Sequence, residues 1–330
     1  MEYRTLGRTG LRVSVLGFGG GNIGGLLIRG EAAAQRQAVA RALEAGINYF
    51  DTAAQYGDGR SEETLGRLLR ELGATVFVGT KVRLVPGAVA EAPVALRRAL
   101  EASLRRLGRD YVDIYSLHNA VVRGPDPSGR ALPVEAVCGP VAEGLQAVRA
   151  AGLARFIGFT GLGDTAAIHQ VVASGLFDTV QCYYNVLNPS AGYPGSPDGV
   201  AQDFDGLIDR AAAQGMGVLA IRVLAAGAIT ASPARHPVAG DPGSALAQGG
   251  DYALDLRRAE RLPPLVRELG LESPVELALR FALAKPGIST VLVGFSDLAQ
   301  VEDALRWAAR GPLPPAAVER LLAAVRQPDR

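Results

Sequence analysis

The stretch "INYFDTAAQYGDGRSEETLG" (residues 47–66) contains one complete unit of the fold that the sequence predicts. It opens with a short apolar run, 47–52, of the kind that forms a buried strand, and the carboxylate of Asp51 stands near its end. A loop with a tyrosine, Tyr56, follows, and a helical pattern begins at Ser61. The unit raises one question, which is why a carboxylate and a phenol stand together where a buried strand ends.

The same strand–loop–helix unit recurs along the chain. Apolar strands that are separated by helices are typical of a parallel sheet buried on both faces. The predicted strands span 12–19, 47–52, 75–80, 111–118, 154–160, 178–184, 217–224 and 289–295. The predicted helices span about 31–45, 61–72, 92–107, 140–151, 164–174, 203–214, 273–285 and 297–309. Eight such units predict a (β/α)8 TIM barrel, and a doubly wound open sheet is the alternative.

Several segments fall outside this alternation. Residues 2–14 predict an N-terminal β-hairpin ahead of the first barrel strand. Long loops follow the fourth and seventh predicted strands, at 119–139 and 225–272, and the second contains an extra helix at 253–269. In a barrel both loops lie at the carboxyl-terminal face, where active sites occur. A peripheral helix is expected at 315–326.

Composition narrows the class of protein. The chain has 330 residues, of which 48% are hydrophobic, and we expect residues 1–330 to form a single barrel domain. The 34 basic and 33 acidic residues give a net charge of +1 without a basic run, which argues against a nucleic-acid partner. Neither a membrane span nor a signal peptide is expected. Cys138 and Cys182 stand far apart, which argues against a metal site and favours a cytoplasmic location.

The glycine-rich stretch "GGGNIG" (19–24) follows a predicted strand and matches the G-x-G-x-x-G pattern of dinucleotide-binding folds. The next predicted helix starts only near Glu31, and the nearest acid at a strand end, Asp51, lies too far along the chain. We therefore interpret the stretch as the first strand-to-helix loop of a barrel, with small residues that let a ligand approach the backbone.

Four side chains fall at or just after three successive strand ends: Asp51 and Tyr56 with the second strand, Lys81 with the third and His118 with the fourth. Each alone has a structural explanation, as a turn cap, a packed ring, an exposed amine or a core histidine. Their joint placement at one rim of the barrel is harder to explain by structure alone. Lys81 is also one of only two lysines in the chain, with Lys285.

Proton transfer to a carbonyl oxygen is the chemistry that suits these four groups. A free phenol, with a pKa of about 10, is a poor acid near neutrality, and an adjacent ammonium lowers that pKa. Asp51 is placed to hold Lys81 charged, and His118 to orient the carbonyl. None of the four donates a hydride, so a reduction requires a cofactor. A Schiff base on Lys81 is the alternative chemistry.

These residues stand in motifs that closely resemble the signatures of the aldo-keto reductases. The resemblance covers nearly the whole chain and rests on "YRTLGRTGLRVSVLGFGG" (3–20), "GINYFDTAAQYGDGRSEETLG" (46–66), "VGTKV" (78–82), "DIYSLHN" (113–119) and "STVLVGFSDLAQVEDAL" (289–305). It implies a barrel that binds an extended nicotinamide cofactor. It also implies a catalytic tetrad of Asp51, Tyr56, Lys81 and His118, in which Tyr56 is the general acid in reduction and the general base in oxidation.

The resemblance further implies a set of cofactor-binding positions. Gly161 replaces an asparagine of many members, and Ile221 or Arg222 falls where many stack a tyrosine on the nicotinamide. The implied positions are Gly19, Gly20, Asp51, Thr160, Gln181, Arg222, Leu224, Gly294, Phe295, Ser296, Gln300 and Asp303.

Cofactor choice is less clear at the adenosine end. Gln300 stands where NADP-preferring members often have arginine, and Ala304 where many have asparagine. Arginine suits a phosphate because its fork pairs two oxygens, and Ser296 and Arg306 are candidate substitutes. Family habit favours NADP, with NAD as the alternative.

The expected function is NAD(P)-dependent interconversion of a carbonyl and an alcohol by hydride transfer. The hairpin and "TGLGD" (160–164) most resemble the sugar-dehydrogenase-like branch, including L-galactose and L-fucose dehydrogenases. The expected partner is therefore a small carbonyl or sugar substrate. The alternative is a cofactor-binding regulatory subunit with little turnover. The sequence indicates neither the physiological substrate, nor the preferred direction, nor the oligomeric state.

Overall fold

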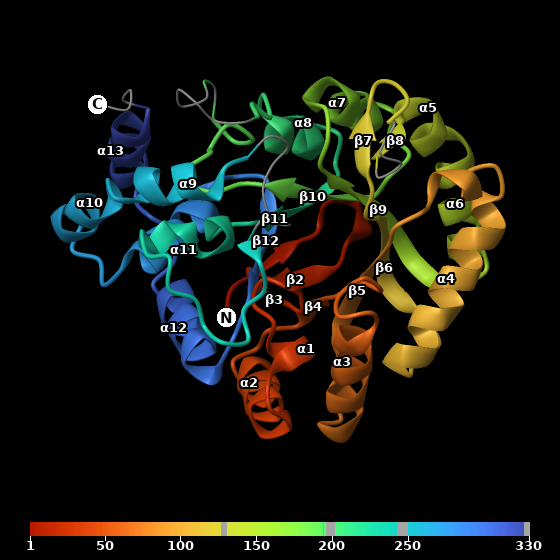
Figure 1. The fold of residues 1–330 in the computed structure, drawn as a ribbon, viewed down its shortest axis with the longest axis horizontal. Coiled ribbons are helices and arrows are strands. Elements are labelled where there is room, and N and C mark those ends of the chain that lie inside the picture. Colours follow the sequence, from red (N-terminus) through yellow and green to blue (C-terminus); the bar gives the residue numbers. More distant parts are fainter. Residues whose placement is uncertain (127–130, 194, 196–201, 243–249, 327–330) are drawn as a thin grey trace.

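In the computed structural model of this chain, eight parallel strands close into a barrel with helices around it (Figure 1). The structure describes residues 1–126, 131–193, 195, 202–242 and 250–326. The closed ring confirms the predicted (β/α)8 fold and excludes the open sheet. The barrel strands are β3 (Leu16–Gly19), β4 (Tyr49–Asp51), β5 (Phe77–Val82), β6 (Val112–Leu117), β9 (Ala154–Gly161), β10 (Thr179–Tyr183), β11 (Gly217–Ile221) and β12 (Ile288–Gly294).

All eight predicted helices form, with ends that differ by a few residues from the prediction. Local signals mark several ends: the Ser273 and Asp297 side chains cap α11 and α12, and Gly108 takes the left-handed conformation, φ 63°, after α4. The helices are α2 (Ala32–Glu44), α3 (Arg60–Glu71), α4 (Ala92–Leu107), α6 (Ala142–Ala150), α7 (Thr165–Ala173), α8 (Leu207–Ala213), α11 (Pro274–Ala284) and α12 (Leu298–Ala309).

The N-terminal hairpin closes one end of the barrel. Strands β1 (Tyr3–Thr5) and β2 (Arg12–Ser14) pair antiparallel, so the predicted strand 12–19 is in fact two strands, β2 and β3. The hairpin side chains fill the amino-terminal end of the barrel and leave its other end open. The cluster inside the barrel consists of Leu6, Leu11, Val13, Tyr49, Ile114, Leu219 and Leu292.

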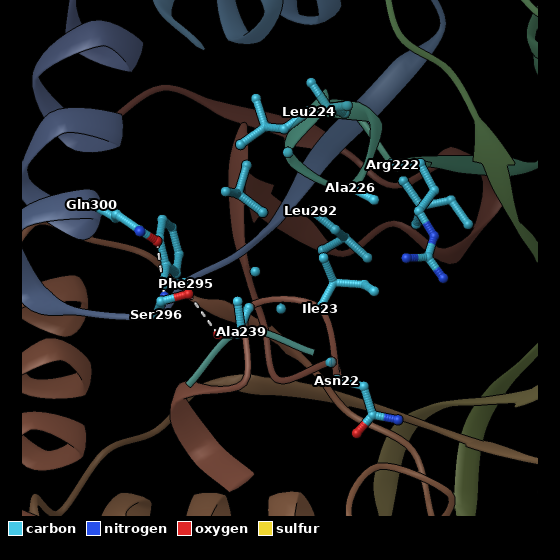
Figure 2. A pocket seen from close by; sticks show the side chains of 18 of the residues that line it. Asn22, Ile23, Arg222, Leu224, Ala226, Ala239, Leu292, Phe295, Ser296 and Gln300 are labelled. Carbon is cyan, nitrogen blue, oxygen red and sulfur yellow. Dashed lines mark hydrogen bonds between the residues drawn. The ribbon is translucent and has the colours of Figure 1, made fainter. Parts of the chain in front are cut away.

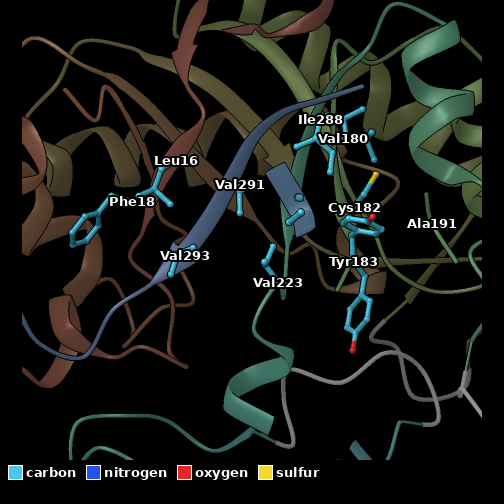
Figure 3. Packing of buried hydrophobic residues seen from close by; sticks show 14 of the residues in the cluster. Leu16, Phe18, Val180, Cys182, Tyr183, Ala191, Val223, Ile288, Val291 and Val293 are labelled. Atoms are coloured by element: carbon cyan, nitrogen blue, oxygen red, sulfur yellow. The ribbon is translucent and has the colours of Figure 1, made fainter. Parts of the chain in front are cut away.

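Side chains on the outer face of the strands pack under the helices. In β12 the residues alternate, because Leu292 belongs to the inner cluster while Val291 and Val293 belong to the outer one. Figure 3 shows this outer layer with Leu16 and Phe18 of β3 on one side of β12. Burial on both faces explains why the barrel strands are mostly apolar.

The two long loops contain more structure than the sequence predicts. The first includes β7 (Ala120–Val122), β8 (Ala131–Pro133), α5 (Val134–Ala136) and a π-helical turn (Val137–Val141). The second begins with a 3₁₀ segment (Ala225–Thr230), and its predicted helix 253–269 is two helices, α9 (Tyr252–Ala259) and α10 (Leu262–Glu268). Two prolines in the first turn of α10 explain the break, since proline suits the start of a helix and not its interior. Residues 127–130 and 243–249 of these loops lie outside the described residues. The expected peripheral helix is α13 (Pro315–Val325), and a short α1 (Leu26–Arg29) was not expected.

Gly66 provides a test of helix packing. A methyl group on Gly66 of α3 would lie 2.2 Å from the carbonyl oxygen of Leu107, at the end of α4. Replacing a glycine inside a helix by alanine usually stabilises the helix. We expect Gly66→Ala instead to lower the free energy of unfolding by about 1–3 kcal/mol, because the added methyl group overpacks the contact with α4. Urea denaturation measures this. Gly124→Ala is the control, because its methyl meets no atom within 4 Å; equal stability of the two variants would contradict the packing.

Candidate active site

Asp51, Tyr56, Lys81 and His118 come together at the carboxyl-terminal rim of the barrel. Asp51 is the last residue of β4, Lys81 lies in the neighbouring β5, and His118 directly follows β6. Tyr56 lies in the turn between β4 and α3. The Lys81 Nζ donates hydrogen bonds to the Tyr56 hydroxyl at 3.5 Å, to the Thr52 carbonyl oxygen at 2.8 Å and to Asp51. The structure therefore brings the amine and the phenol into contact.

Asp51 and Lys81 form a buried ion pair, with exposed fractions of only 6% and 1%. The Gln181 Nε2 donates a second hydrogen bond, 2.8 Å long, to the other carboxylate oxygen of Asp51. Burial by itself lowers the pKa of Lys81, but the Asp51 carboxylate and the Tyr56 hydroxyl reverse this and hold that pKa above its ordinary value. Burial raises the pKa of Asp51, and Lys81 and Gln181 oppose that rise. Lys81 is consequently a positively charged ammonium throughout the neutral range.

His118 lies edge-on to Tyr56, with ring centroids 5.7 Å apart and planes at 85°. Burial holds the pKa of His118 well below its ordinary value, and the positive charges of Lys81, Arg83 and Arg222 lower it further. His118 is therefore neutral near pH 7. Its Nδ1 lies 3.2 Å from the Gln55 Oε1, so Gln55 orients the ring.

A cavity of about 570 Å³ extends from Tyr56 and His118 to α12. Figure 2 shows part of its lining, with Arg222 and Gln300 at opposite sides of the view. Lys81 and Gly20 do not line it: Lys81 lies behind Tyr56, and the Gly20 N–H is bonded to the Asp51 carbonyl oxygen. The sequence-predicted residues that line the cavity are Gly19, Asp51, Tyr56, His118, Thr160, Gln181, Arg222, Leu224, Gly294, Phe295, Ser296, Gln300 and Asp303.

The glycine-rich loop 19–24 packs against the end of β12. A methyl group on Gly24 would lie 2.5 Å from the Phe295 backbone nitrogen, so only glycine fits there. The Ser296 hydroxyl donates to the Gly24 carbonyl oxygen at 2.7 Å, and the Ser296 N–H donates to the Gln300 side chain at 2.9 Å. The next helix, α1, begins at Leu26 and so earlier than the predicted start near Glu31. The packing of Gly24 still indicates a first barrel loop whose glycines allow close contact between main chains.

Several cavity residues were missed by the sequence reasoning. Gln55 stands next to Tyr56 in the same motif, so the sequence could have indicated it. Arg83 lies two positions after Lys81, which is a similar signal. Arg235 and Trp307 come from a long loop and from α12, and no local pattern marks them. The buried Nε of Arg235 has no hydrogen-bond partner in the described part of the chain.

Two further features concern the described residues as a whole, membrane-spanning helices and metal-binding clusters. No helix there is long and apolar enough to cross a membrane. The same residues contain no group of three or more His, Cys, Asp or Glu side chains that would hold a metal ion.

Comparison with known proteins identifies the family of this chain. A model of the Aldo/keto reductase family matches residues 15–326. The chain belongs to the aldo/keto reductase family. This aldo/keto reductase is therefore an oxidoreductase that interconverts carbonyl and alcohol groups with a nicotinamide cofactor.

Individual relatives resemble this aldo/keto reductase over most of their length. L-galactose dehydrogenase of Arabidopsis thaliana is 30% identical over 315 residues, which cover 92% of this chain and 86% of the relative. A probable voltage-gated potassium channel subunit beta of Oryza sativa subsp. japonica is 30% identical over 326 residues, covering 93% and 90%. The structure of a holo-form aldo-keto reductase from Bacillus halodurans shares the fold, with a TM-score of 0.71, 24% identity and coverage of 98% and 96%.

The low pKa of His118 predicts a loss of stability in acid. As pH falls below about 6.5, the unfolded chain binds a proton at this histidine while the folded chain does not, so the free energy of unfolding falls by up to about 1.4 kcal/mol per pH unit. Urea denaturation at about pH 7.5 and 5.5 measures the loss. We expect His118→Asn to reduce it, and an unchanged loss would contradict a neutral, buried His118.

Proposed function

We propose that Tyr56 transfers the proton in the reaction of this oxidoreductase, on an aldehyde or a sugar. The observation that supports this most is the contact between the Lys81 ammonium and the Tyr56 hydroxyl, 3.5 Å apart, in a site where Lys81 is buried with Asp51. An ammonium at that position stabilises a phenolate, so Tyr56 can give up a proton and take it back.

In the proposed reduction, Tyr56 donates its proton to the carbonyl oxygen as the alcohol forms. The nicotinamide supplies the hydride in reduction and accepts it in oxidation. Lys81 stabilises the phenolate that remains, and Asp51 keeps Lys81 charged and in place. The neutral His118 lies beside Tyr56 and lines the cavity, where its ring helps to position the substrate oxygen. In oxidation each step runs in reverse.

A Schiff base on Lys81 is less well supported. The amine is 1% exposed, does not line the cavity and is held charged by Asp51, whereas a nucleophilic amine must be neutral and accessible.

The cavity lining fits an extended nicotinamide dinucleotide. Thr160 and Gln181 offer a hydroxyl and an amide at the tetrad end, and Phe295 and Trp307 offer aromatic rings. The buried Nε of Arg235, which has no partner among the described residues, is a donor of the kind that phosphate oxygens accept. We propose that the cofactor is held by the main chain of Arg222 and by main-chain or side-chain atoms of Gly19, Asp51, Thr160, Gln181, Leu224, Gly294, Phe295, Ser296, Gln300 and Asp303. Gly20, which the resemblance also implied, does not line the cavity, because its N–H is bonded to the Asp51 carbonyl oxygen.

We further propose that the protein accepts both NADP and NAD. Arg306, which the sequence offered as a candidate for the 2′-phosphate, does not line the cavity and already pairs with Glu272 and Asp303 at 2.8 Å each. Gln300 at the same end is neutral and bonds to Ser296. Family habit favours NADP, but in the described residues these contacts leave little charge to select it.

A regulatory subunit is the second candidate, because a probable potassium channel subunit beta is 30% identical over most of the chain. This candidate predicts cofactor binding without multiple turnover.

We place either activity in the cytoplasm, because Cys138 and Cys182 are both free cysteines in the structure and a reducing compartment keeps them so.

Tyr56→Phe tests the assigned proton donor. We expect kcat/KM for aldehyde reduction to fall by about 10²–10⁴-fold while cofactor affinity is retained, because only the transferred proton is lost. Absorbance of the reduced nicotinamide follows turnover over an aldehyde and aldose panel. Tyr111→Phe is the control, since Tyr111 is 40% exposed on the surface. Equal rates for Tyr56→Phe and wild type would refute the role, and no turnover of any substrate would favour the regulatory subunit.

Gln300→Arg tests cofactor choice. We expect wild type to bind NADPH and NADH within about tenfold of each other, and the variant to gain about tenfold or more for NADPH, because a charged fork then faces the phosphate. Fluorescence titration measures both dissociation constants. A wild type that binds NADPH more than about a hundredfold tighter would contradict dual use.

A further inference from the structure

Arg222 places a positive charge in the cavity, and the proposed function assigns no anionic partner to that charge. It follows β11 directly, and its half-buried side chain, labelled in Figure 2, lines the cavity. Tyr56 and His118 line the same cavity. No carboxylate lies within ion-pair distance of it in the described parts of the chain. Burial lowers the pKa of Arg222, and Tyr56 and Tyr183 oppose that effect. A cation desolvated in this way gains from an anion that arrives with a ligand.

The backbone holds Arg222 in an uncommon conformation. Its φ is 61°, in the left-handed region that residues with a side chain rarely adopt. Asn185 Nδ2 donates to the Arg222 carbonyl oxygen at 3.1 Å, and the Ala225 N–H donates to the same oxygen at 2.8 Å. Such strain persists only where surrounding contacts impose it, and it is concentrated at functional sites. In our proposal the main chain of Arg222 contacts the cofactor, and its side chain is left to bind another ligand in the cavity.

Arg83 adds a second positive charge to the same part of the cavity. It directly follows β5, is exposed and lines the cavity. The charges of Arg83 and Arg222 both act on His118, which places them near the tetrad. The described lining contains two carboxylates, and both have partners: Asp51 with Lys81 and Asp303 with Arg306. The tetrad end is therefore positively charged, although the whole chain is nearly neutral.

We propose that Arg222, assisted by Arg83, binds an anionic group of the substrate, so that the preferred substrates are aldehydes or alcohols with a carboxylate or a phosphate near the reacting carbon. A guanidinium pairs with two oxygens of either anion. Arg222 lies across the cavity from Gln300, which argues against a role for its side chain at the adenosine end (Figure 2). This inference rests on the proposed oxidoreductase function and adds the class of substrate.

The test compares each anionic substrate with a neutral analogue. 4-Carboxybenzaldehyde is compared with its methyl ester, and glyceraldehyde 3-phosphate with glyceraldehyde, which separates carboxylate from phosphate recognition. We expect wild type to prefer at least one anion over its neutral partner by about tenfold or more in kcat/KM. We expect Arg222→Gln to lose most of that preference through KM, and Arg222→Lys to lose less because it keeps the charge. Arg36→Gln, which removes an exposed arginine of α2, is the matched control.

The outcomes separate this inference from the proposed function. An unchanged preference in Arg222→Gln would overturn the inference. So would an equal loss on charged and neutral substrates with weaker NADPH and NADH binding, which would assign the side chain to the cofactor. If wild type turns over no aldehyde, the proposed function fails, and calorimetry with 4-(hydroxymethyl)benzoate and its methyl ester decides the inference separately. If wild type binds the carboxylate more tightly than the ester and Arg222→Gln abolishes that difference, the inference is upheld. If wild type binds the two ligands equally, the inference is refuted.

Discussion

The mechanism that we propose for the mouth of this barrel depends on the buried ion pair between Lys81 and Asp51. Removing two charges from water costs several kcal/mol per ion, so such a pair persists only when hydrogen bonds satisfy its remaining atoms. Here the Thr52 carbonyl oxygen and the Gln181 amide provide those bonds, from the residue after β4 and from the opposite side of the ring. The pair holds an ammonium against the hydroxyl of Tyr56, where a lone buried lysine would tend to lose its proton.

The closed barrel gives this pair its geometry. Parallel pairing aligns Asp51 of β4 with Gly79 of β5, so Lys81 stands two residues further toward the rim. The hairpin fills the opposite end, which leaves one open mouth for a ligand. The segment after β11 completes that mouth and contains four non-glycine residues at positive φ, Arg222, Ala225, Ala226 and Ala231. Strain is thus concentrated where the cavity is built and not in the strands and helices that support it.

Much of the fold and of the tetrad was predictable because the signals are local. Apolar runs, helical patterns and terminal glycines indicate each unit, and the ends of neighbouring parallel strands must share one rim. The split of 12–19 and the break between α9 and α10 were missed, because the first depends on packing under the barrel and the second on two prolines inside a helical pattern. The direction of Arg222 was unpredictable, since no sequence pattern marks a non-glycine residue at positive φ. Arg306 pairs with Asp303 one turn earlier on α12 and with Glu272 through a tertiary contact that the sequence does not mark. These two pairs argue against Arg306 as a phosphate ligand.

The most direct test of the account is a double-mutant cycle on kcat/KM for Tyr56→Phe, Lys81→Met and the double variant. If the ammonium acts through the phenol, the two residues work as one unit, and the double variant is about as slow as the slower single variant. If the losses of the two single variants multiply in the double variant, Lys81 contributes independently of Tyr56 and the account is wrong.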